Sequence, residues 1–330
     1  MCSIKMSKIL ITGGAGFIGS YLLNAIIPSN KYDQVRVFDN LSTGKIDNIS
    51  SWLGRSNFNF VQADILDSCT LDKTVDTCDT VFHLAANSTV ALGAINTKID
   101  YEQNLMTTYN LLEAMRKSHG CKKMIFTSTS TVYGEVDKMP ISENYSPLKP
   151  ISLYGATKLA CEALISGYCH MFDMSCIIVR LANIIGLGTH GVIHDFITKL
   201  FSNRNYLEIL GNGMQNKSYL YINDCIEALI LLLEIVEEKT FDIFNLGSDD
   251  TITVSDIAEI VIHELDFSDV QKRFIDKHDG RGWTGDVREY LLDCSKMKDI
   301  GWRPRYKSKD AVILTVREHL SRKTNLPCQT

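Results

Sequence analysis

Short apolar runs alternate with helix-patterned segments through the first 184 residues of the chain. The runs are rich in Val and Ile, which predicts strands buried on both faces. Strands separated by amphipathic helices form a parallel sheet with helices on both sides. The expected strands are 8–12, 34–40, 58–64, 78–86, 122–129 and 175–183, and the expected helices include 16–27, 100–118 and 153–172.

The pattern loosens after about residue 184, where short helices and a polar loop at 276–289 follow no repeated unit. We therefore expect two domains, 1–184 and 185–330, with some segments near 215–250 returning to the first. The chain has only six prolines and no low-complexity linker, which argues against a separately tethered domain. The predicted fold class is α/β: a doubly wound parallel sheet with a smaller α/β C-terminal lobe.

The charge balance of the chain argues against several kinds of partner. The formal net charge is −5 without any basic run, which disfavours nucleic acid and anionic membranes. No stretch is long enough to span a bilayer, and the N-terminal apolar run is too short for a signal peptide. Cysteines lie in apolar segments without a C-x-x-C pair, so we expect a reduced, cytoplasmic protein without a metal site. The cysteines expected in the core are Cys69, Cys121, Cys161, Cys169, Cys176 and Cys225.

The segment "TGGAGFIG" lies between the first expected strand and the first expected helix. In this context Gly13 permits a tight turn, Gly16 lets the backbone approach a pyrophosphate, and Gly19 lets the helix pack on the sheet. The free N–H groups and the dipole at the start of the helix favour the negative phosphates. The segment therefore predicts a Rossmann-type dinucleotide site.

Acidic and small residues follow the next strands. Asp39 stands twenty residues after Gly19, where a ribose-binding acid belongs. Its carboxylate would repel a 2′-phosphate, so the sequence favours NAD over NADP. Asp64 either contacts an adenine edge or is a solvated acid at a strand end, and His83 is expected in the core rather than in catalysis. The small residues of "HLAAN" would either let a cofactor lie against a strand end or allow a helix to pack closely there.

Two polar stretches, "STSTVYGE" and "SLYGATKLACEA", predict the chemistry. Tyr154 and Lys158 are four residues apart and therefore share one face of a helix. A nearby ammonium lowers the pKa of a phenol, which would make Tyr154 a usable base. A hydroxyl at the end of the preceding strand would hold the substrate oxygen against Tyr154. The pattern predicts hydride transfer between a hydroxyl-bearing carbon and a nicotinamide.

Further segments extend this pattern over nearly the whole chain, among them "VFDNLSTG", "FHLAA", "LYGATK", "VRLAN", "HGVIHDF" and "GDVREYLLDCSKMKDIGWRP". Together they resemble the extended short-chain dehydrogenase/reductase family, in particular its UDP-glucose (UDP-galactose) 4-epimerase branch. The resemblance implies Thr129, Tyr154 and Lys158 as catalytic residues, and a homodimer paired through helices 100–118 and 153–172. The NAD contacts that it implies are Gly13, Gly16, Phe17, Ile18, Gly19, Asp39, Asn40, Ser42, Thr43, Gly44, Asp64, Ile65, Leu84, Ala85, Ala86, Asn104, Thr127, Tyr154 and Lys158.

Ser130 and Thr131 bear on which reaction of this family the resemblance implies. The 4,6-dehydratases of the family carry Asp and Glu at these positions, and many UDP-glucuronate decarboxylases keep the Glu. Neither Ser nor Thr is an acid or base near neutral pH. The resemblance therefore favours C4 epimerisation of a UDP-hexose, UDP-galactose or UDP-glucose, through a transient 4-keto intermediate. A UDP-glucuronate 4-epimerase, a 4,6-dehydratase, a 4-keto reductase and a non-catalytic NAD-binding regulator stay open as alternatives.

The second lobe is expected to bind the UDP-sugar. The resemblance implies that Asn183 and Lys217 contact the diphosphate, and that backbone groups of residues 191–193 face the uracil. Tyr219 or Tyr221 would pack on the nucleotide or belong to the core.

The polar segment "DGRGWTGDV" adds further expected substrate contacts. Arg281 is a second candidate for the diphosphate, and Asp286 is a ribose-binding or loop-orienting acid. Tyr290 falls where the family adjusts room for an N-acetyl group, and its bulk favours UDP-glucose and UDP-galactose. The expected substrate contacts are Ser88, Ser128, Thr129, Asn183, Gly191, Val192, Ile193, Lys217, Tyr219, Arg281, Asp286 and Tyr290.

Overall fold

The computed structural model describes residues 7–237 and 240–324. Two compact units are assembled from segments that lie far apart in the sequence. Unit 1 consists of Met1–Val132, Leu153–Arg180 and Ile226–Phe244, and unit 2 consists of Tyr133–Ser152, Leu181–Cys225 and Asn245–Thr330. The chain therefore passes between the units several times.

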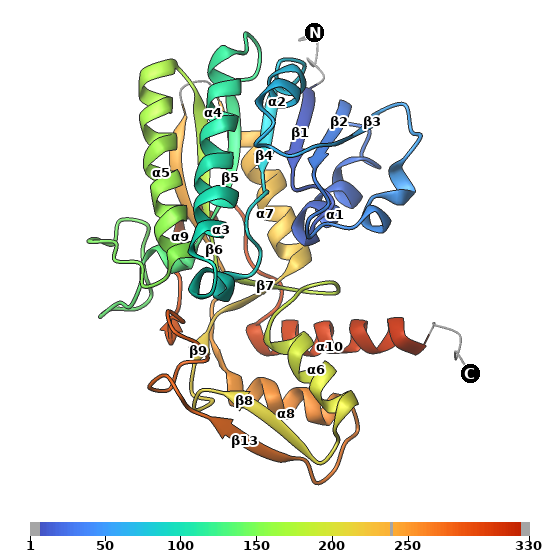
Figure 1. Ribbon diagram of the computed structural model, residues 1–330, viewed down its shortest axis with the longest axis vertical. Helices are drawn as coiled ribbons and strands as arrows, with labels where there is room; N and C mark the ends of the chain where they lie inside the picture. The colour runs from blue at the N-terminus through green and yellow to red at the C-terminus, as the bar shows by residue number, and fades with distance from the viewer. Residues whose placement is uncertain (1–6, 238–239, 325–330) are drawn as a thin grey trace. The chain divides into compact units, whose positions relative to one another are not determined.

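Unit 1 is built on a seven-stranded sheet of order β11-β6-β5-β4-β1-β2-β3 (Figure 1). Its strands are β1 (Ser7–Thr12), β2 (Tyr32–Asp39), β3 (Phe58–Gln62), β4 (Thr80–His83), β5 (Lys123–Thr129), β6 (Ser175–Leu181) and β11 (Phe241–Leu246). The pairs β1–β2, β1–β4, β2–β3 and β4–β5 are parallel, which confirms the predicted α/β class. The strand order reverses at β1, and sheets of this kind bind ligands at the carboxyl ends of the strands beside such a reversal.

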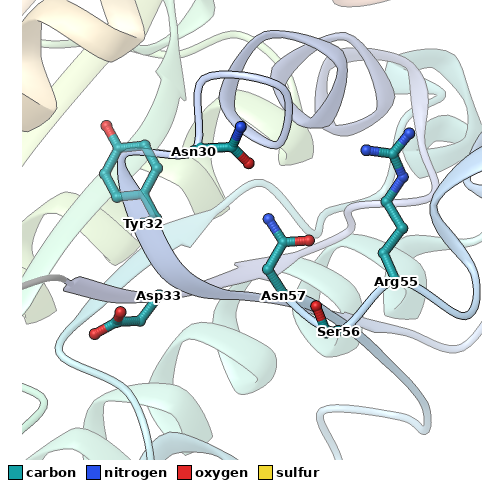
Figure 2. Close-up of a pocket in the computed structure, with 6 residues that line it drawn as sticks. All are labelled: Asn30, Tyr32, Asp33, Arg55, Ser56 and Asn57. Atoms are coloured by element: carbon teal, nitrogen blue, oxygen red, sulfur yellow. The ribbon is translucent and has the colours of Figure 1, made fainter.

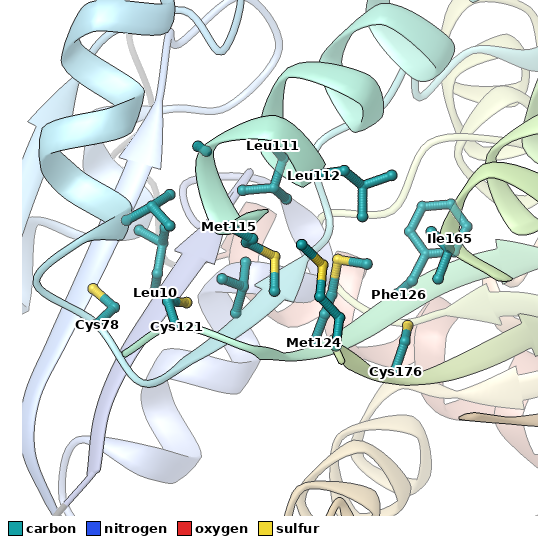
Figure 3. Close-up of a cluster of buried hydrophobic side chains, with 14 of the residues drawn as sticks. Leu10, Cys78, Leu111, Leu112, Met115, Cys121, Met124, Phe126, Ile165 and Cys176 are labelled. Atoms are coloured by element: carbon teal, nitrogen blue, oxygen red, sulfur yellow. The ribbon is translucent and has the colours of Figure 1, made fainter. Parts of the chain in front are cut away.

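One face of this sheet carries a hydrophobic core (Figure 3). Alternate strand residues such as Leu10, Met124 and Phe126 point to the same face and are fully or almost fully buried. Helices α2 (Ser68–Val75), α4 (Thr107–Lys117) and α5 (Leu153–Phe172) cover them with side chains that include Leu111 and Ile165. Each such buried side chain contributes roughly 1.5–3 kcal/mol of hydrophobic stabilisation. This core fixes β5 and α5, which carry the catalytic candidates Thr129, Tyr154 and Lys158.

The helices around the sheet include those predicted near 16–27 and 153–172, whereas the helix predicted at 100–118 consists of three segments. They are α1 (Phe17–Ile26), α2 (Ser68–Val75), α3 (Thr97–Asp100), α4 (Thr107–Lys117), α5 (Leu153–Phe172) and α7 (Ile222–Ile235), with short 3-10 turns η1 (Ile46–Asn48), η2 (Ser50–Trp52), η3 (Val90–Ala94) and η5 (Ser130–Val132). The helix expected at 100–118 is instead α3, a π-helical segment η4 (Tyr101–Met106) and α4. The hydroxyls of Thr107 and Thr108 donate to the carbonyl of Asn104, and such back-bonding accompanies the local widening.

Unit 2 combines small sheets with four helices (Figure 1). Parallel pairs join β7 (Asn183–Ile185) to β10 (Tyr219–Tyr221) and β8 (Tyr206–Leu210) to β13 (Gln271–Ile275). A third sheet holds β12 (Ile252–Thr253), β9 (Asn216–Lys217) and β14 (Glu289–Tyr290). The helices are α6 (Val192–Ser202), α8 (Val254–Glu264), α9 (Ser295–Asp299) and α10 (Ser308–Thr324).

The predicted core cysteines are buried with one exception. Cys69 is exposed, because it lies in the first turn of α2 on the side opposite the buried Leu71 and Val75. Within residues 7–237 and 240–324 no helix has the length and apolarity to cross a membrane.

Candidate active site

The glycine segment forms a tight turn between β1 and α1. Gly13 adopts a left-handed φ of +69°, and a Cβ there would lie 2.8 Å from the backbone nitrogen of Ala85. Gly16 caps α1 without any side-chain hydrogen bond, and the first turn of α1 carries no acid. Helix starts leave N–H groups without intrahelical acceptors. This end of α1 is therefore suited to a phosphate anion, as the sequence predicts.

Asp39, at the end of β2, holds the same turn together. Its two carboxylate oxygens accept hydrogen bonds from the backbone N–H groups of Ala15 (2.9 Å) and Leu41 (2.8 Å). Carboxylate oxygens have further lone pairs, so Asp39 keeps acceptor capacity for ribose hydroxyls. The residue thus has a structural role beside its predicted binding role.

Several predicted NAD contacts lie next to Asp39 at the ends of β2 and β3. The amide of Asn40 donates to Asp64 (2.8 Å), and its oxygen accepts from the N–H of Ser42 (2.9 Å). Gly44 approaches Ala15 and Asp39 so closely that a Cβ would lie 3.0 Å from each. Ser42 and Thr43 are exposed, whereas Ile65 is buried.

The end of β4 contributes a buried histidine and small residues. His83 is hydrogen-bonded to the hydroxyls of Thr12 (2.8 Å) and Thr108 (3.0 Å), and burial lowers its pKa to about 3. His83 is therefore a neutral core residue. The half-buried Leu84, Ala85 and Ala86 follow it, whereas the predicted substrate contact Ser88 is exposed.

The hydroxyls at the end of β5 have three different partners. Thr127 donates to the carbonyl of His83 (3.2 Å). Ser128 donates to the buried carboxylate of Glu162 (2.5 Å). Thr129 is hydrogen-bonded only to the neighbouring Thr131 hydroxyl (3.2 Å) and N–H (3.2 Å), among the contacts of the described residues. Of the three, Thr129 is the one whose hydroxyl is not committed to the core.

Tyr154 and Lys158 lie in the first turns of α5. The ammonium of Lys158 donates to the carbonyl of Thr127 (2.9 Å) and lies 4.6 Å from the ring centre of Phe126. Burial lowers the pKa of Lys158 to about 8. Burial, followed by the charge of Asp100, raises the pKa of Tyr154. Without ligands, Tyr154 is therefore a protonated phenol that needs additional positive charge to become a base.

Asn104, predicted to contact the cofactor, links the β4 loop to α5. Its amide nitrogen donates to Asp100 (3.1 Å) and to the hydroxyl of Thr157 (3.1 Å), and its amide oxygen accepts from the N–H of Asn87 (2.9 Å). The side chain is buried, so within unit 1 its role is to join these elements.

The basic candidates of unit 2 are paired with acids. Lys217 binds Asp286 (2.5 Å), while Arg281 binds Glu135 (2.7 Å) and donates to the carbonyl of Asp286 (2.7 Å). Arg281 lowers the pKa of Glu135. Asp286 also accepts from the N–H of Gly282 (3.2 Å), so it orients its own loop. The structure thus brings Lys217, Arg281 and Asp286 together.

The two tyrosine candidates of unit 2 are buried. Tyr219 of β10 is 5% exposed and is paired in register with the partly buried Asn183 of β7. Tyr290 is 4% exposed and stands opposite Lys217 in the β14–β9 pair.

Residues 191–193 form the start of α6. Gly191 adopts a φ of +119° at the N-cap, and the side chain of Ile193 is buried in the core. Gly191 is exposed and Val192 partly exposed, so the predicted contact of this turn with the uracil stays a prediction.

The surface has hollows in both units. One, of about 520 Å³, is lined by Asn30, Tyr32, Asp33, Arg55, Ser56 and Asn57, at the amino ends of β2 and β3 (Figure 2). The other, of about 570 Å³, belongs to unit 2 and includes Glu135, Gln215 and Arg288. Within the described ranges no three His, Cys, Asp or Glu side chains are grouped so as to hold a metal ion.

Comparison with known proteins decides the family. The family model for GDP-mannose 4,6 dehydratase matches residues 10–315. A relative from Methanocaldococcus jannaschii, provisionally named a UDP-glucose 4-epimerase, is 34% identical over 312 residues, which cover 92% of this chain and 95% of the relative. The chain belongs to the extended short-chain dehydrogenase/reductase family.

Solved structures of extended short-chain dehydrogenases/reductases share the fold. A UDP-galactose 4-epimerase structure has 35% identity and a TM-score of 0.83, covering 96% of this chain and 99% of that chain. The UDP-glucuronic acid 4-epimerase of Bacillus cereus, solved with UDP-glucuronic acid and NAD, has 30% identity and a TM-score of 0.86, with the same coverage. The protein is therefore a nucleotide-sugar enzyme of the epimerase and dehydratase group.

Relatives with other reactions are also similar within this family. A dTDP-D-glucose 4,6-dehydratase of Bos taurus is 28% identical over 317 residues, and a UDP-glucuronic acid decarboxylase of Arabidopsis thaliana is 29% identical over 316 residues. Overall similarity therefore leaves the reaction open, and individual residues must decide it.

Sequence reasoning missed three residues that shape the site. Asp100 is a buried acid whose charge acts on Tyr154, Glu162 accepts from Ser128, and Glu135 binds Arg281. Glu135 and Glu162 both lie inside the polar stretches that predicted the chemistry. An acid within such a stretch could have indicated that these two residues belong to the site. Asp100 had no local signal, because its partners come from other elements.

Proposed function

We propose that the protein binds NAD and interconverts UDP-galactose and UDP-glucose by epimerisation at C4. The proposal combines three features of unit 1: the glycine turn, the Tyr154–Lys158 pair of α5, and the Thr129 hydroxyl, which is bonded to the neighbouring Thr131 and not to the core. The family relationship supports the nucleotide-sugar class of substrate.

NAD fits the residues of the glycine turn. The uncapped start of α1 would hold the pyrophosphate, and Asp39 would accept from ribose hydroxyls. The carboxylate of Asp39 disfavours the 2′-phosphate of NADP. Bound NAD would accept a hydride from the sugar and return it. The remaining cofactor contacts are those that the resemblance implies.

Tyr154 is the proposed base and acid. Its phenolate would take the proton of the sugar 4-hydroxyl while C4 loses its hydride, which leaves a 4-keto sugar. The Thr129 hydroxyl would hold the oxygen at C4, and the Lys158 ammonium would stabilise the phenolate. Once the keto sugar has turned, hydride returns to its other face and Tyr154 returns the proton. Protons and electrons balance over the cycle, so no net oxidation occurs.

Unit 2 is proposed to bind the nucleotide. Lys217 and Arg281 are cations held by Asp286 and Glu135, and a diphosphate would compete for them. Asn183 and the backbone of residues 191–193 would complete the nucleotide contacts. Buried Tyr290 would limit the room beside the sugar.

The observation that carries epimerisation over dehydration is the chemistry of Ser130 and Thr131. Dehydration across C5 and C6 needs an acid and a base beside the catalytic threonine. Ser130 is buried, and the hydroxyl of Thr131 is bonded to Thr129. Neither side chain exchanges a proton near neutral pH, which leaves Tyr154 as the proton carrier.

A proton NMR assay tests the proposal. Purified protein is incubated without reductant with UDP-galactose, UDP-glucose, their N-acetyl analogues and UDP-glucuronate. We expect UDP-galactose and UDP-glucose to interconvert without accumulation of NADH. A 4-keto-6-deoxy or pentose product would refute the argument from Ser130 and Thr131, and epimerisation confined to UDP-glucuronate or N-acetyl sugars would refute the assigned substrate.

A further inference from the structure

Asp100 is a buried acid at the end of α3 that the proposed reaction does not use. It is fully buried, and one carboxylate oxygen accepts from the side-chain amides of Asn87 (2.8 Å) and Asn104 (3.1 Å). The other oxygen is buried without a hydrogen-bond partner among the described residues. Leaving a charged oxygen unpaired is costly, so the position calls for a reason.

Gly93 brings this carboxylate to the start of α5. A Cβ on Gly93 would lie 2.2 Å from the unpartnered oxygen of Asp100 and 3.6 Å from the Cβ of Leu153. The missing side chain thus makes room for the acid beside the residue that precedes Tyr154. Any larger residue at 93 would push the carboxylate away.

A chain of hydrogen bonds makes a second connection between Asp100 and Tyr154. Asn104 donates to both Asp100 and the Thr157 hydroxyl, and that hydroxyl donates to the carbonyl of Tyr154 (3.1 Å). Asp100 therefore contacts the first turn of α5 through Gly93 and through Asn104.

The other titratable groups near Tyr154 are paired or neutral. On α5, Glu162 is neutralised by Arg180 (2.7 Å), and burial raises the pKa of Cys161, which keeps that thiol protonated. On β4, His83 is neutral because burial lowers its pKa to about 3. β5, η3 and η5 bring no charged side chain to this turn.

The segment that follows α3 also adds no unpaired charge near Tyr154. Its acid, Glu102, is partly exposed and paired with Lys98 (2.8 Å). Asp100 is thus the charged group that acts on Tyr154, and its carboxylate also attracts the Lys158 ammonium.

We propose that the Asp100 carboxylate, held beside the start of α5 by Gly93 and Asn104, keeps the proton on the Tyr154 hydroxyl, and that its bond to Asn104 positions the first turn of α5. This inference rests on the proposed function, in which Tyr154 must lose that proton to act. Asp100 then sets the pH at which the enzyme turns over, without touching substrate. Tyr154 would then stay protonated until substrate and cofactor bind, and would lose its proton only in the complex.

The first test measures Tyr154 directly and needs no turnover. The protein is labelled with tyrosine carrying ¹³C at Cζ and titrated at alkaline pH, and Tyr154→Phe identifies the signal. Asp100→Asn keeps the acceptor oxygen and removes the charge. We expect the ionised fraction of Tyr154 at a fixed pH below the midpoint to rise about tenfold, because a neighbouring charge shifts a pKa by about one unit or more. Glu102→Gln removes an equal charge from the next segment and should leave the signal unchanged.

The second test is the pH dependence of turnover with UDP-galactose. In Asp100→Asn the rising limb of kcat should move to lower pH by about one unit, whereas KM should stay unchanged. If Asp100→Asn does not fold, Asp100→Ser removes the same charge with a smaller side chain and replaces it in both tests.

The proposal would be overturned if the Tyr154 titration curve were the same in Asp100→Asn, or in its replacement Asp100→Ser, as in the wild type. It would also be overturned if Glu102→Gln shifted that curve equally. Absence of turnover in the wild-type protein would instead refute the proposed function. The NMR titration would still decide the role of Asp100.

Discussion

Tyr154 is a base whose surroundings in the unliganded protein favour its protonated form. Burial and the Asp100 carboxylate raise its pKa, and the ammonium of Lys158, one turn further along α5, donates to the carbonyl of Thr127. Sequence reasoning located the Tyr–Lys pair by its four-residue spacing. It did not locate Asp100, because the acid reaches Tyr154 through contacts of Gly93 and Asn104 that local periodicity does not encode.

Replacing Tyr154 by Phe removes the proton carrier and little else. We expect turnover of UDP-galactose to fall by at least about 10²-fold, since a positioned acid or base contributes about 10²–10⁴-fold. NAD binding, measured by calorimetry, should be retained because the glycine turn is untouched. Wild-type turnover in Tyr154→Phe would disprove the catalytic assignment.

Lys158 leads to a prediction about stability and pH. Burial lowers its pKa from 10.5 to about 8, so between these values the unfolded chain binds more protons than the folded protein. Stability therefore rises with pH across this window. The free energy of unfolding of the wild type should therefore rise between pH 8 and 10.5 relative to that of Lys158→Met. At about 1.4 kcal/mol per pKa unit, the rise should reach about 3 kcal/mol.

Chemical denaturation at several pH values measures this difference. Lys158→Arg serves as the control, because a guanidinium stays charged throughout the window and the wild type should show the same gain against it. A difference that is flat with pH would contradict the burial of a charged lysine at this position.

At the scale of elements, the pairing of β5 with α5 decides which hydroxyls are available. Glu162, one turn beyond Lys158, forms a buried ion pair with Arg180 of β6 and accepts from Ser128. Because strand side chains alternate, fixing Ser128 to this pair directs Thr129 the other way. The sequence shows the hydroxyls, but it does not show that the buried Glu162 carboxylate binds Ser128 alone. For this reason both Ser128 and Thr129 were predicted as substrate contacts.

Breaking this ion pair should destabilise unit 1. Glu162→Ala leaves Arg180 buried and unpaired, which costs about 3–5 kcal/mol of unfolding free energy. The double variant Glu162→Leu with Arg180→Met removes both charges and should recover most of that loss. Urea unfolding measures both. If the double variant unfolds as easily as the single one, the loss comes from packing rather than from the unpaired charge.

The helices show what pattern can and cannot predict. α5 occupies residues 153–172 as its apolar spacing indicates, since that spacing runs without interruption for five turns. The π-helical segment between α3 and α4 was not predicted. It depends on Asn104 finding partners in the β4 loop and on α5, and tertiary partners leave no mark on helical periodicity.

At the scale of the molecule, long-range pairing builds the units. Residues 133–152 belong to unit 2 although they precede α5, and the N–H of Ile141 donates to the carbonyl of Leu291 (2.8 Å). The tyrosine of "STSTVYGE" donates from its hydroxyl to Asn245 (2.7 Å). Contacts over such sequence separations cannot be predicted from the local periodicity of apolar residues. The glycine turn and the parallel sheet could be predicted, because their signals are local.

The quaternary state is the last expectation of the sequence, a homodimer formed through the helices around 100–118 and 153–172. Large apolar side chains on these helices are exposed: Tyr101 is 50%, Tyr109 is 42% and Met171 is 74% exposed. Exposed apolar side chains gathered on neighbouring helices favour burial against another surface, and α4 and α5 pack side by side in unit 1 (Figure 1). Light scattering of the wild-type protein at micromolar concentration should give the mass of a dimer.

Tyr109→Glu tests which helices form this dimer. In a two-fold interface one substitution places a carboxylate in both copies, so repulsion and lost apolar burial act together and the protein should become monomeric. Met214→Glu is the matched control, because Met214 is 62% exposed but belongs to unit 2, and this variant should stay dimeric. A monomeric wild type would disprove the dimer. A Tyr109→Glu protein that stays dimeric would place the interface on other elements, and the exposed tyrosines of unit 1 would then need a different partner.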